Sequence, residues 1–201
     1  VWRARCNDDT NIKSSALAAK MTPAPSLVAF DVDGTLLRGD TICECIARSI
    51  GRFDEMAAFE RLTSRQEIAG ARREMLRWYE EHDKSRLISC LRNGVRLAPG
   101  AKTALARLRE NGVRTALVSI TWSFAVEWLA RELDADFWIG THWEGGGKVV
   151  DFWPEDKVDW LQNLLAELGL ARETLAAVGD SGGDVPMLTF AAHGYFVGAV
   201  M

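Results

Sequence analysis

Short apolar runs alternate along this chain with stretches in which apolar residues recur at every third or fourth position. The runs predict buried strands at 27–30, 113–118, 136–139, 175–178 and 195–200. The helical spacing predicts helices at 99–111, 123–133 and 157–168. Gly112 and Gly169, which follow two of these helices, are typical helix ends, and the glycines within 142–150 indicate a hairpin. Strands and helices in this order favour an α/β fold, a Rossmann-like parallel sheet with helices on both faces.

The segment 38–97 breaks the alternation, because it has charges at helical spacing and no convincing strand. We predict that it forms a small helical cap inserted after the first strand, at the edge of the sheet where such folds bind ligands. The α/β catalytic core would then comprise residues 26–37 and 98–201. Residues 1–25 are mostly polar or small and lack a sustained period, so a flexible N-terminal extension is expected.

Composition narrows the classes of function. The 201 residues, 48% hydrophobic and 26% charged, suffice for one domain plus an insertion. The net charge of −4, with acidic and basic residues interleaved, argues against a nucleic-acid partner. No apolar run approaches the roughly 20 residues that span a bilayer, so no membrane partner is predicted and a cytoplasmic location is expected. The four cysteines lack the spacing of a zinc site and are interpreted as reduced thiols. The oligomeric state stays open.

Two carboxylates stand where the first strand leaves the sheet. Asp31 and Asp33 follow the apolar run 27–30 directly, and Gly34 allows a sharp turn after them. Like charges this close raise each other's pKa unless a cation or a shared proton relieves them. A metal-assisted chemical site is therefore the simplest interpretation.

Further polar residues follow later strands or begin helices at the same predicted edge. Ser119 ends the strand run 113–118, Lys157 begins an amphipathic helix, and Asp180 and Asp184 follow the strand run 175–178. Each alone has an ordinary structural explanation, as a helix cap, a solvated lysine or a turn acid. Because the carboxyl ends of parallel strands meet at one edge, their joint occurrence favours a single site.

These residues resemble the four motifs of the haloacid dehalogenase superfamily of phosphohydrolases. Asp31-Val32-Asp33-Gly34-Thr35 is similar to motif I, Ser119 to motif II, Lys157 to motif III, and Asp180 with Asp184 to motif IV. The inserted cap and the phrase Leu97-Ala98-Pro99-Gly100 look most like the phosphoserine phosphatase branch. The chain departs from that branch at Ile120-Thr121-Trp122, where two glycines are common, and at Gly183, where asparagine is usual.

The resemblance implies a magnesium-dependent phosphomonoester hydrolase with an aspartyl-phosphate intermediate. Asp31 would be the nucleophile, and Asp33 would protonate the leaving oxygen and later activate water. Asp31, Asp180 and the backbone carbonyl of Asp33 would hold Mg²⁺, whose preferred ligands are hard oxygen atoms. Ser119 and Lys157 would bind the phosphoryl group.

The remaining implied roles concern support and substrate choice. Asp184 would orient Lys157 or a metal-bound water, and Thr35 would help hold the phosphate loop. The substrate would be a small phosphorylated metabolite, phosphoserine or a related compound, with Asp40 binding its amino group and Arg72 or Arg73 its carboxylate. Departures from the branch leave this choice open.

Other functions share parts of this pattern. The same chemistry could pass the phosphoryl group to a small alcohol, which would make the protein a phosphotransferase. A phospho-acceptor signalling domain also uses an aspartate, magnesium and a lysine, but such domains lack a helical lid. A catalytically silent binding protein is a third alternative, although all four motif positions carry reactive residues.

Overall fold

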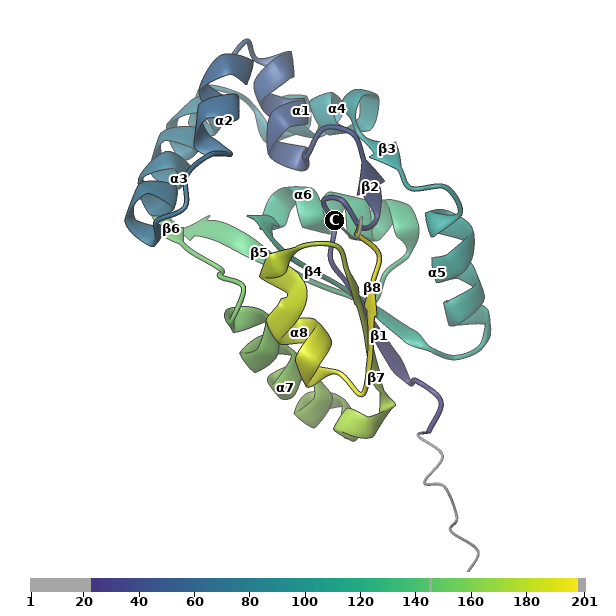
Figure 1. Cartoon of the computed structure of the whole chain (residues 1–201). Coiled ribbons are helices and arrows are strands. Elements are labelled where there is room, and N and C mark those ends of the chain that lie inside the picture. Colours follow the sequence, from purple (N-terminus) through teal and green to yellow (C-terminus); the bar gives the residue numbers. More distant parts are fainter. Residues whose placement is uncertain (1–22, 145, 199–201) are drawn as a thin grey trace, which may run out of the picture.

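The computed structural model describes residues 23–144 and 146–198 (Figure 1). Its strands are β1 (Leu27–Phe30), β2 (Leu37–Arg38), β3 (Arg96–Leu97), β4 (Arg114–Trp122), β5 (Phe137–Glu144), β6 (Lys148–Val150), β7 (Leu175–Gly179) and β8 (His193–Phe196). Its α-helices are α1 (Ile42–Ser49), α2 (Phe53–Phe59), α3 (Arg65–Glu80), α4 (Lys84–Gly94), α5 (Ala101–Glu110), α6 (Ser123–Leu133), α7 (Asp156–Leu168) and α8 (Val185–Phe190). The predicted extension 1–25 lies almost entirely outside the described residues.

Six strands form one sheet in the order β6-β5-β4-β1-β7-β8. All neighbours in it are parallel except β5 and β6, which form the antiparallel hairpin that the glycines at 145–147 predicted. β1 lies in the middle, between β4 and β7. The predicted α/β fold with a mostly parallel sheet is thus confirmed, and the carboxyl end of β1 opens at the centre of the sheet.

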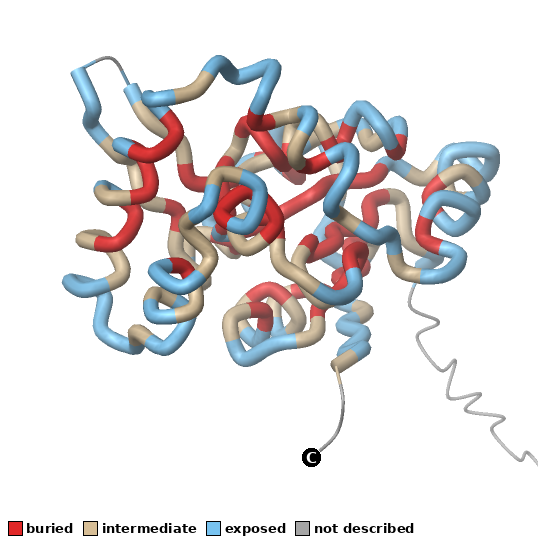
Figure 2. Tube along the Cα trace, turned by 90° about the horizontal axis from the view of Figure 1, so that it is seen from above, coloured by how far each residue is buried: buried red, intermediate tan, exposed pale blue. Residues whose placement is uncertain are grey.

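Helices cover both faces of this sheet. In β1, Val28 and Phe30 belong to the core cluster that includes α5 and α6, whereas Leu27 and Ala29 belong to the cluster under α7 and α8. This alternation follows from the strand period of two. All four residues are buried because both faces are covered, which explains why β1 is a continuous apolar run. Figure 2 shows the buried segments enclosed by exposed turns.

Helices α1 to α4 form a cap above the carboxyl edge of the sheet (Figure 1). The chain enters it through β2 and leaves it through β3, and these two short strands pair antiparallel. α1 begins with a capping box in which Thr41 and Glu44 each accept a backbone N–H. The predicted helical insertion is confirmed, although the two-residue strands at its ends were not expected; its limits at 38 and 97 stay a prediction.

Several element boundaries differ from the sequence prediction. β4 was expected to end at Val118 but runs to Trp122, because after a register irregularity Trp122 pairs with Thr141 of β5. β5 likewise extends past Ile139 to Glu144, where β6 provides a partner strand. The last strand was expected at 195–200 but begins at His193 and ends at Phe196. The short helix α8 was not predicted at all.

Within residues 23–144 and 146–198, no helix combines the length and apolar character needed to cross a membrane.

Candidate active site

Asp31 continues the line of β1 at the centre of the sheet. Its backbone N–H donates to the carbonyl of Val178 in β7 at 2.9 Å, so the carboxylate leaves the sheet at a fixed point. The residue is only 6% exposed. Burial raises the pKa of Asp31 to about 7, although Lys157 acts in the opposite direction. Positive charge placed at this carboxylate would favour its ionised form.

The loop after Asp31 contacts the loop after β7. Thr35 donates its hydroxyl to Oδ1 of Asp180 at 2.8 Å. Gly34 has φ +84°, and a Cβ added there would lie 2.1 Å from Oδ2 of Asp180. The glycine is therefore needed twice, for the backbone conformation and for the close approach of a carboxylate.

Lys157 lies between two carboxylates. Its Nζ donates to Oδ1 of Asp31 at 2.8 Å and to Oδ1 of Asp184 at 2.6 Å, and only 1% of the residue is exposed. Burial by itself would lower the pKa of Lys157, but Asp31 and Asp184 together raise it above its ordinary value. The lysine is thus held as a buried cation beside Asp31.

Asp184 is the most enclosed acid of the site. Its Oδ2 accepts the backbone N–H groups of Asp180 and Ser181 and the hydroxyl of Ser181, while Oδ1 accepts from Lys157. Burial opposes ionisation, yet Lys157 and the hydrogen bonds from Ser181 hold the pKa of Asp184 below its ordinary value. An ionised Asp184 therefore fixes both the lysine and the turn that carries Asp180.

Three carboxylates gather closely enough to share a cation. Oxygen atoms of Asp31, Asp180 and Asp184 all lie within 4.8 Å of one another. Carboxylate oxygens are the donors that Mg²⁺ and other hard divalent cations prefer. The residues present therefore fit a divalent metal ion. Asp33, which was predicted as a ligand through its backbone carbonyl, does not contribute its side chain to this cluster.

The Asp33 carboxylate instead contacts the start of the cap. Oδ1 accepts the backbone N–H of Ile42, the first residue of α1, at 2.7 Å. Burial raises the pKa of Asp33 to about 7, and the hydrogen bond from Ile42 only partly offsets this. A carboxyl group that titrates near neutral pH can give up and recover a proton under the same conditions.

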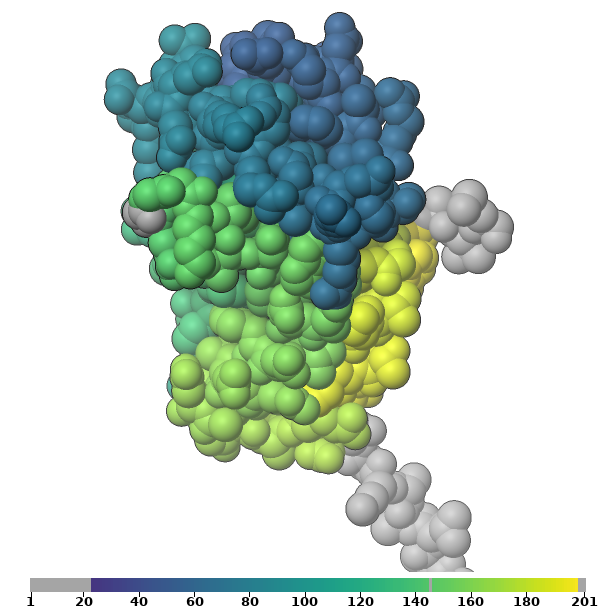
Figure 3. All heavy atoms as spheres, turned by 90° about the vertical axis from the view of Figure 1, so that its left-hand side faces the viewer, coloured from purple at the N-terminus to yellow at the C-terminus, as the bar shows by residue number. Residues whose placement is uncertain are grey.

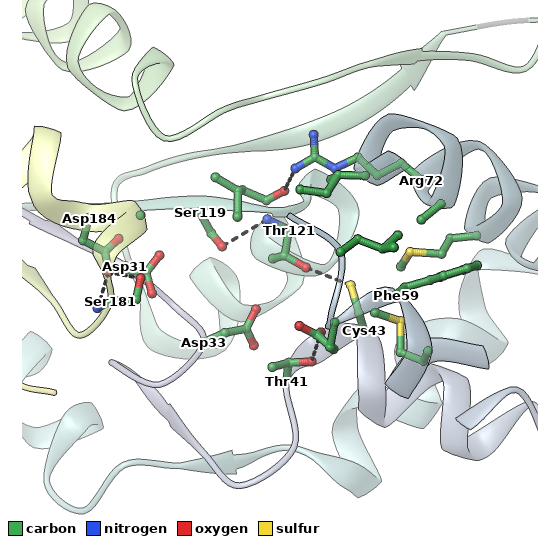
Figure 4. A pocket seen from close by; sticks show the side chains of 18 of the residues that line it. Asp31, Asp33, Thr41, Cys43, Phe59, Arg72, Ser119, Thr121, Ser181 and Asp184 are labelled. Atoms are coloured by element: carbon green, nitrogen blue, oxygen red, sulfur yellow. Dashed lines mark hydrogen bonds between the residues drawn. The ribbon is translucent and has the colours of Figure 1, made fainter. Parts of the chain in front are cut away.

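Ser119 lies in the irregular part of β4, rather than after the strand's end. It is 2% exposed, and its Oγ accepts the backbone N–H of Thr121 at 3.2 Å. Since an accepting hydroxyl still has its own hydrogen to donate, Ser119 can donate to an oxygen in the cavity beside it. Figure 4 shows Ser119 between Thr121 and the side chains of Asp31 and Asp184.

Of the three cap residues predicted to bind the substrate, the structure places Arg72 at the cavity and Asp40 and Arg73 away from it. Arg72, on α3, is 7% exposed and lines the same cavity as Asp31. Asp40 and Arg73 are not among the described residues that line it: Asp40 accepts from Arg48 Nε at 2.8 Å, and Arg73 is exposed. Sequence order alone could not separate Arg72 from its neighbour.

The cavity has a volume of about 330 Å³ and lies between the cap and the sheet edge. Sequence analysis missed most of its cap side, which comes from α2, the loop after it and α3. The residues it missed there are Met56, Phe59, Glu60, Leu62, Ile68, Ala71 and Met75. It also missed Ser181, for which the phrase Gly179-Asp180-Ser181-Gly182-Gly183-Asp184 offered a signal, because a hydroxyl between two acids of one turn lies close to both.

The carboxylate-lysine site lies at the carboxyl end of the central strand, which is where open α/β sheets bind ligands and where enzymes of this fold class place their reacting groups. The sequence profile of the haloacid dehalogenase-like hydrolases matches residues 28–189. The chain belongs to this family, as the motifs around Asp31 and Asp180 indicated.

Named relatives fall in the phosphoserine phosphatase branch. Phosphoserine phosphatase SerB2 of Mycobacterium tuberculosis is 32% identical over 178 residues, which cover 84% of this chain and 43% of the relative. Phosphoserine phosphatase of Halobacterium salinarum is 34% identical over 178 residues, 81% of either chain. A third relative, the phosphoserine phosphatase of Archaeoglobus fulgidus, is 27% identical over 179 residues, which cover 84% of this chain and 51% of the relative. The chain thus spans about half the length of two of these relatives.

Solved structures share the fold. A haloacid dehalogenase family hydrolase from Salmonella enterica serovar Typhi has a TM-score of 0.71 and 24% identity, over 86% of this chain and 62% of the other. A substrate-bound phosphoserine phosphatase has a TM-score of 0.68 and 22% identity, over 85% of this chain and 84% of the other. At this identity the likeness concerns the architecture, including the inserted cap.

Proposed function

We propose that this protein is a magnesium-dependent phosphomonoester hydrolase that acts through a phosphorylated Asp31. The single observation that carries the proposal is the contact of Lys157 Nζ with both Asp31 and Asp184, in a cavity that a cap covers. A carboxylate attacks a phosphate ester only where positive charge offsets the repulsion between the two anions. The buried ammonium group supplies part of that charge.

The mechanism uses this chain's residues in two halves. Asp31 attacks phosphorus and displaces the alcohol, whose oxygen takes a proton from Asp33. Asp33 then takes a proton from water as the water attacks the phosphorus of the aspartyl-phosphate, which releases inorganic phosphate and restores Asp31. Ser119 and Lys157 donate hydrogen bonds to the phosphoryl oxygens as charge develops on them.

A divalent cation completes the charge balance in this proposal. Asp31, Asp180 and the carbonyl of Asp33 would hold Mg²⁺, and Asp184 lies close enough to support it directly or through water. When bound, the ion would neutralise negative charge on the phosphoryl group.

Phosphate release from p-nitrophenyl phosphate tests the proposal. We expect Asp31→Asn to lower kcat by at least about 1,000-fold, because the nucleophile is lost. Asp159→Asn is the matched control, since Asp159 is an exposed residue of α7, and it should retain the wild-type rate. Chelation of divalent cations should abolish turnover and Mg²⁺ should restore it. A wild-type rate in Asp31→Asn would refute the proposal.

The names of the relatives supply phosphoserine as the first substrate to assay, since several are phosphoserine phosphatases. Transfer of the phosphoryl group to a small alcohol uses the same intermediate. Product analysis with added alcohols separates the two reactions, because transfer yields a new phosphate ester in place of inorganic phosphate.

A further inference from the structure

The cavity has two chemically different ends. At one end, Asp31, Ser119 and Lys157 form the polar site, and Figure 4 shows Asp31 and Asp184 together there. The other end is walled by apolar side chains of the cap: Met56, Phe59, Leu62, Ile68, Ala71 and Met75. In Figure 4, Phe59 lies on the side of the cavity away from Asp31. The alcohol part of an ester whose phosphate occupies the polar end would face this wall.

The cationic group nearest the apolar wall is already paired. Arg72 donates Nη1 to Asp151 at 2.7 Å and Nη2 to the carbonyls of Ile120 and Phe152 at 3.1 and 3.3 Å. Its guanidinium also lies 4.5 Å from the ring centre of Trp153. These contacts direct the group toward the core and neutralise its charge. A carboxylate on the substrate would have to compete with Asp151 for it.

The other polar groups near the wall do not favour an anion. Cys43 and Thr121 share a hydrogen bond at 3.3 Å. Glu60 is a carboxylate whose pKa burial raises, and the nearby Glu44 raises it further. Among the described residues that line the cavity, positive charge comes from Lys157 and Arg72, each of which contacts a carboxylate. An added carboxylate would therefore lose hydration without gaining an unpaired cation.

We propose that the preferred substrate is a phosphate monoester of a largely apolar alcohol, such as a short alkyl chain or a single ring. This inference rests on the proposed phosphomonoesterase function and adds the substrate class. An apolar group that reaches the wall leaves water and gains free energy in proportion to the area it buries. The volume of about 330 Å³ is at the small end of ligand cavities, so the alcohol part must be compact.

A series of alkyl phosphates tests the inference with leaving groups of similar basicity. With ethyl, butyl and hexyl phosphate, kcat/KM should rise by up to about fourfold for each methylene group that becomes buried. O-phosphoserine is ethyl phosphate with an ammonium and a carboxylate group on its second carbon. We expect its kcat/KM to be at least about tenfold below that of butyl phosphate. Phosphoethanolamine, which carries the ammonium group alone, should also be slower than butyl phosphate.

Two variants connect the preference to the wall. Ile68 is half-buried and lines the cavity, whereas Ile88 of α4 is half-buried in the cap core and does not line it. Ile68→Thr should lower the ratio of the hexyl to the ethyl phosphate rate by at least about threefold. Ile88→Thr makes the same chemical change and should leave that ratio unaltered.

The possible outcomes separate this inference from the function on which it rests. The apolar preference is overturned if kcat/KM is equal for ethyl, butyl and hexyl phosphate, or if kcat/KM for phosphoserine or phosphoethanolamine is at or above that of butyl phosphate. Either result would leave the proposed hydrolase function intact. Equal ratios in Ile68→Thr and wild type also overturn the apolar preference. If no ester is hydrolysed above the Asp31→Asn background, the proposed function itself fails, and the substrate class falls with it.

Discussion

The pair formed by Arg72 and Asp151 should be a principal contact between the cap and the core. Arg72 comes from α3 and Asp151 from the segment after β6, and their side chains are 9% and 22% exposed. Figure 3 shows the cap resting on the residues of the β5–β6 hairpin at this side of the molecule. We predict that Asp151→Asn destabilises the protein, because it leaves a buried guanidinium beside a neutral amide.

The magnitude follows from the burial of the two groups. Breaking a fully buried ion pair costs about 3–5 kcal/mol, whereas exposed pairs contribute about 0–1 kcal/mol. Asp151 keeps contact with water, so we expect a loss of about 2 kcal/mol in the free energy of unfolding. In a chain of this size that corresponds to a fall in Tm of about 4–8 °C.

A double-mutant cycle measures the interaction energy between Arg72 and Asp151 separately from the other effects of each substitution. Urea unfolding of wild type, Arg72→Gln, Asp151→Asn and the double variant should give a coupling energy of about 1–3 kcal/mol. The pair Lys148–Glu144, whose side chains are 69% and 53% exposed, is the control, with a coupling energy below about 0.5 kcal/mol. If the Arg72–Asp151 coupling were no larger than that of the control, the pair would not anchor the cap.

Three further predictions follow from the site. Lys157→Met should lower kcat at least about 100-fold, because its ammonium offsets charge at the reacting group; a loss below tenfold in steady-state assays would contradict this role. Gly34→Ala should inactivate the protein, because the new Cβ would displace Asp180. In the control Gly112→Ala the added Cβ meets nothing within 4 Å, so only the free energy of unfolding should fall, on the order of 1 kcal/mol. Circular dichroism must show that Gly34→Ala stays folded, and a fully active variant would disprove the close approach. Burial raises the pKa of Cys43 to about 12, so at pH 8 very little of it is the reactive thiolate. Peptide mass spectrometry should show that iodoacetamide alkylates Cys43 at least about 100-fold more slowly in the folded protein than in the protein unfolded by urea, and that the rate in the folded protein rises with pH. Equal rates in the two states would contradict the prediction.

The parts of the fold and site that depend on local pattern could be predicted from the sequence. The run 27–30 is apolar at every position because both faces of the sheet are covered, and that identified β1 as a buried strand. Asp31 and Asp33 then had to lie at its carboxyl end. The structure brings Asp31, Asp180 and Asp184 together there, because β1 and β7 are parallel neighbours.

Long-range partners could not be predicted in the same way. Arg72 or Arg73 was expected to bind a substrate carboxylate, and the carboxylate that Arg72 contacts in the structure is that of Asp151, 79 residues along the chain. Asp40 was expected to bind the amino group of the substrate, and its carboxylate contacts Arg48 in the last turn of α1. Ser119 was expected after a strand that in fact continues to Trp122, because its partner β5 is also longer. For Arg72 and for Ser119, a residue or strand distant in sequence decides the position of the side chain.

The cavity wall illustrates a different limit. Met56 on α2 and Met75 on α3 occupy positions in the helical pattern where an ordinary core residue would stand, and they are 5% and 4% exposed. A side chain that packs on neighbours and one that faces an enclosed space obey the same apolar pattern. Only the placement of the cap over the sheet edge separates the two.

The pairing of β2 with β3 has a consequence for how this protein could change its specificity. Leu37 lies opposite Leu97, so the chain departs for the cap and returns at points one strand spacing apart. Nearly sixty intervening residues could be exchanged as a cassette without stretching the framework that carries Asp31. A different cap joined to the core at β2 and β3 would begin and end at the same two positions. Substrate selectivity could then change while the catalytic residues of the core stay in place.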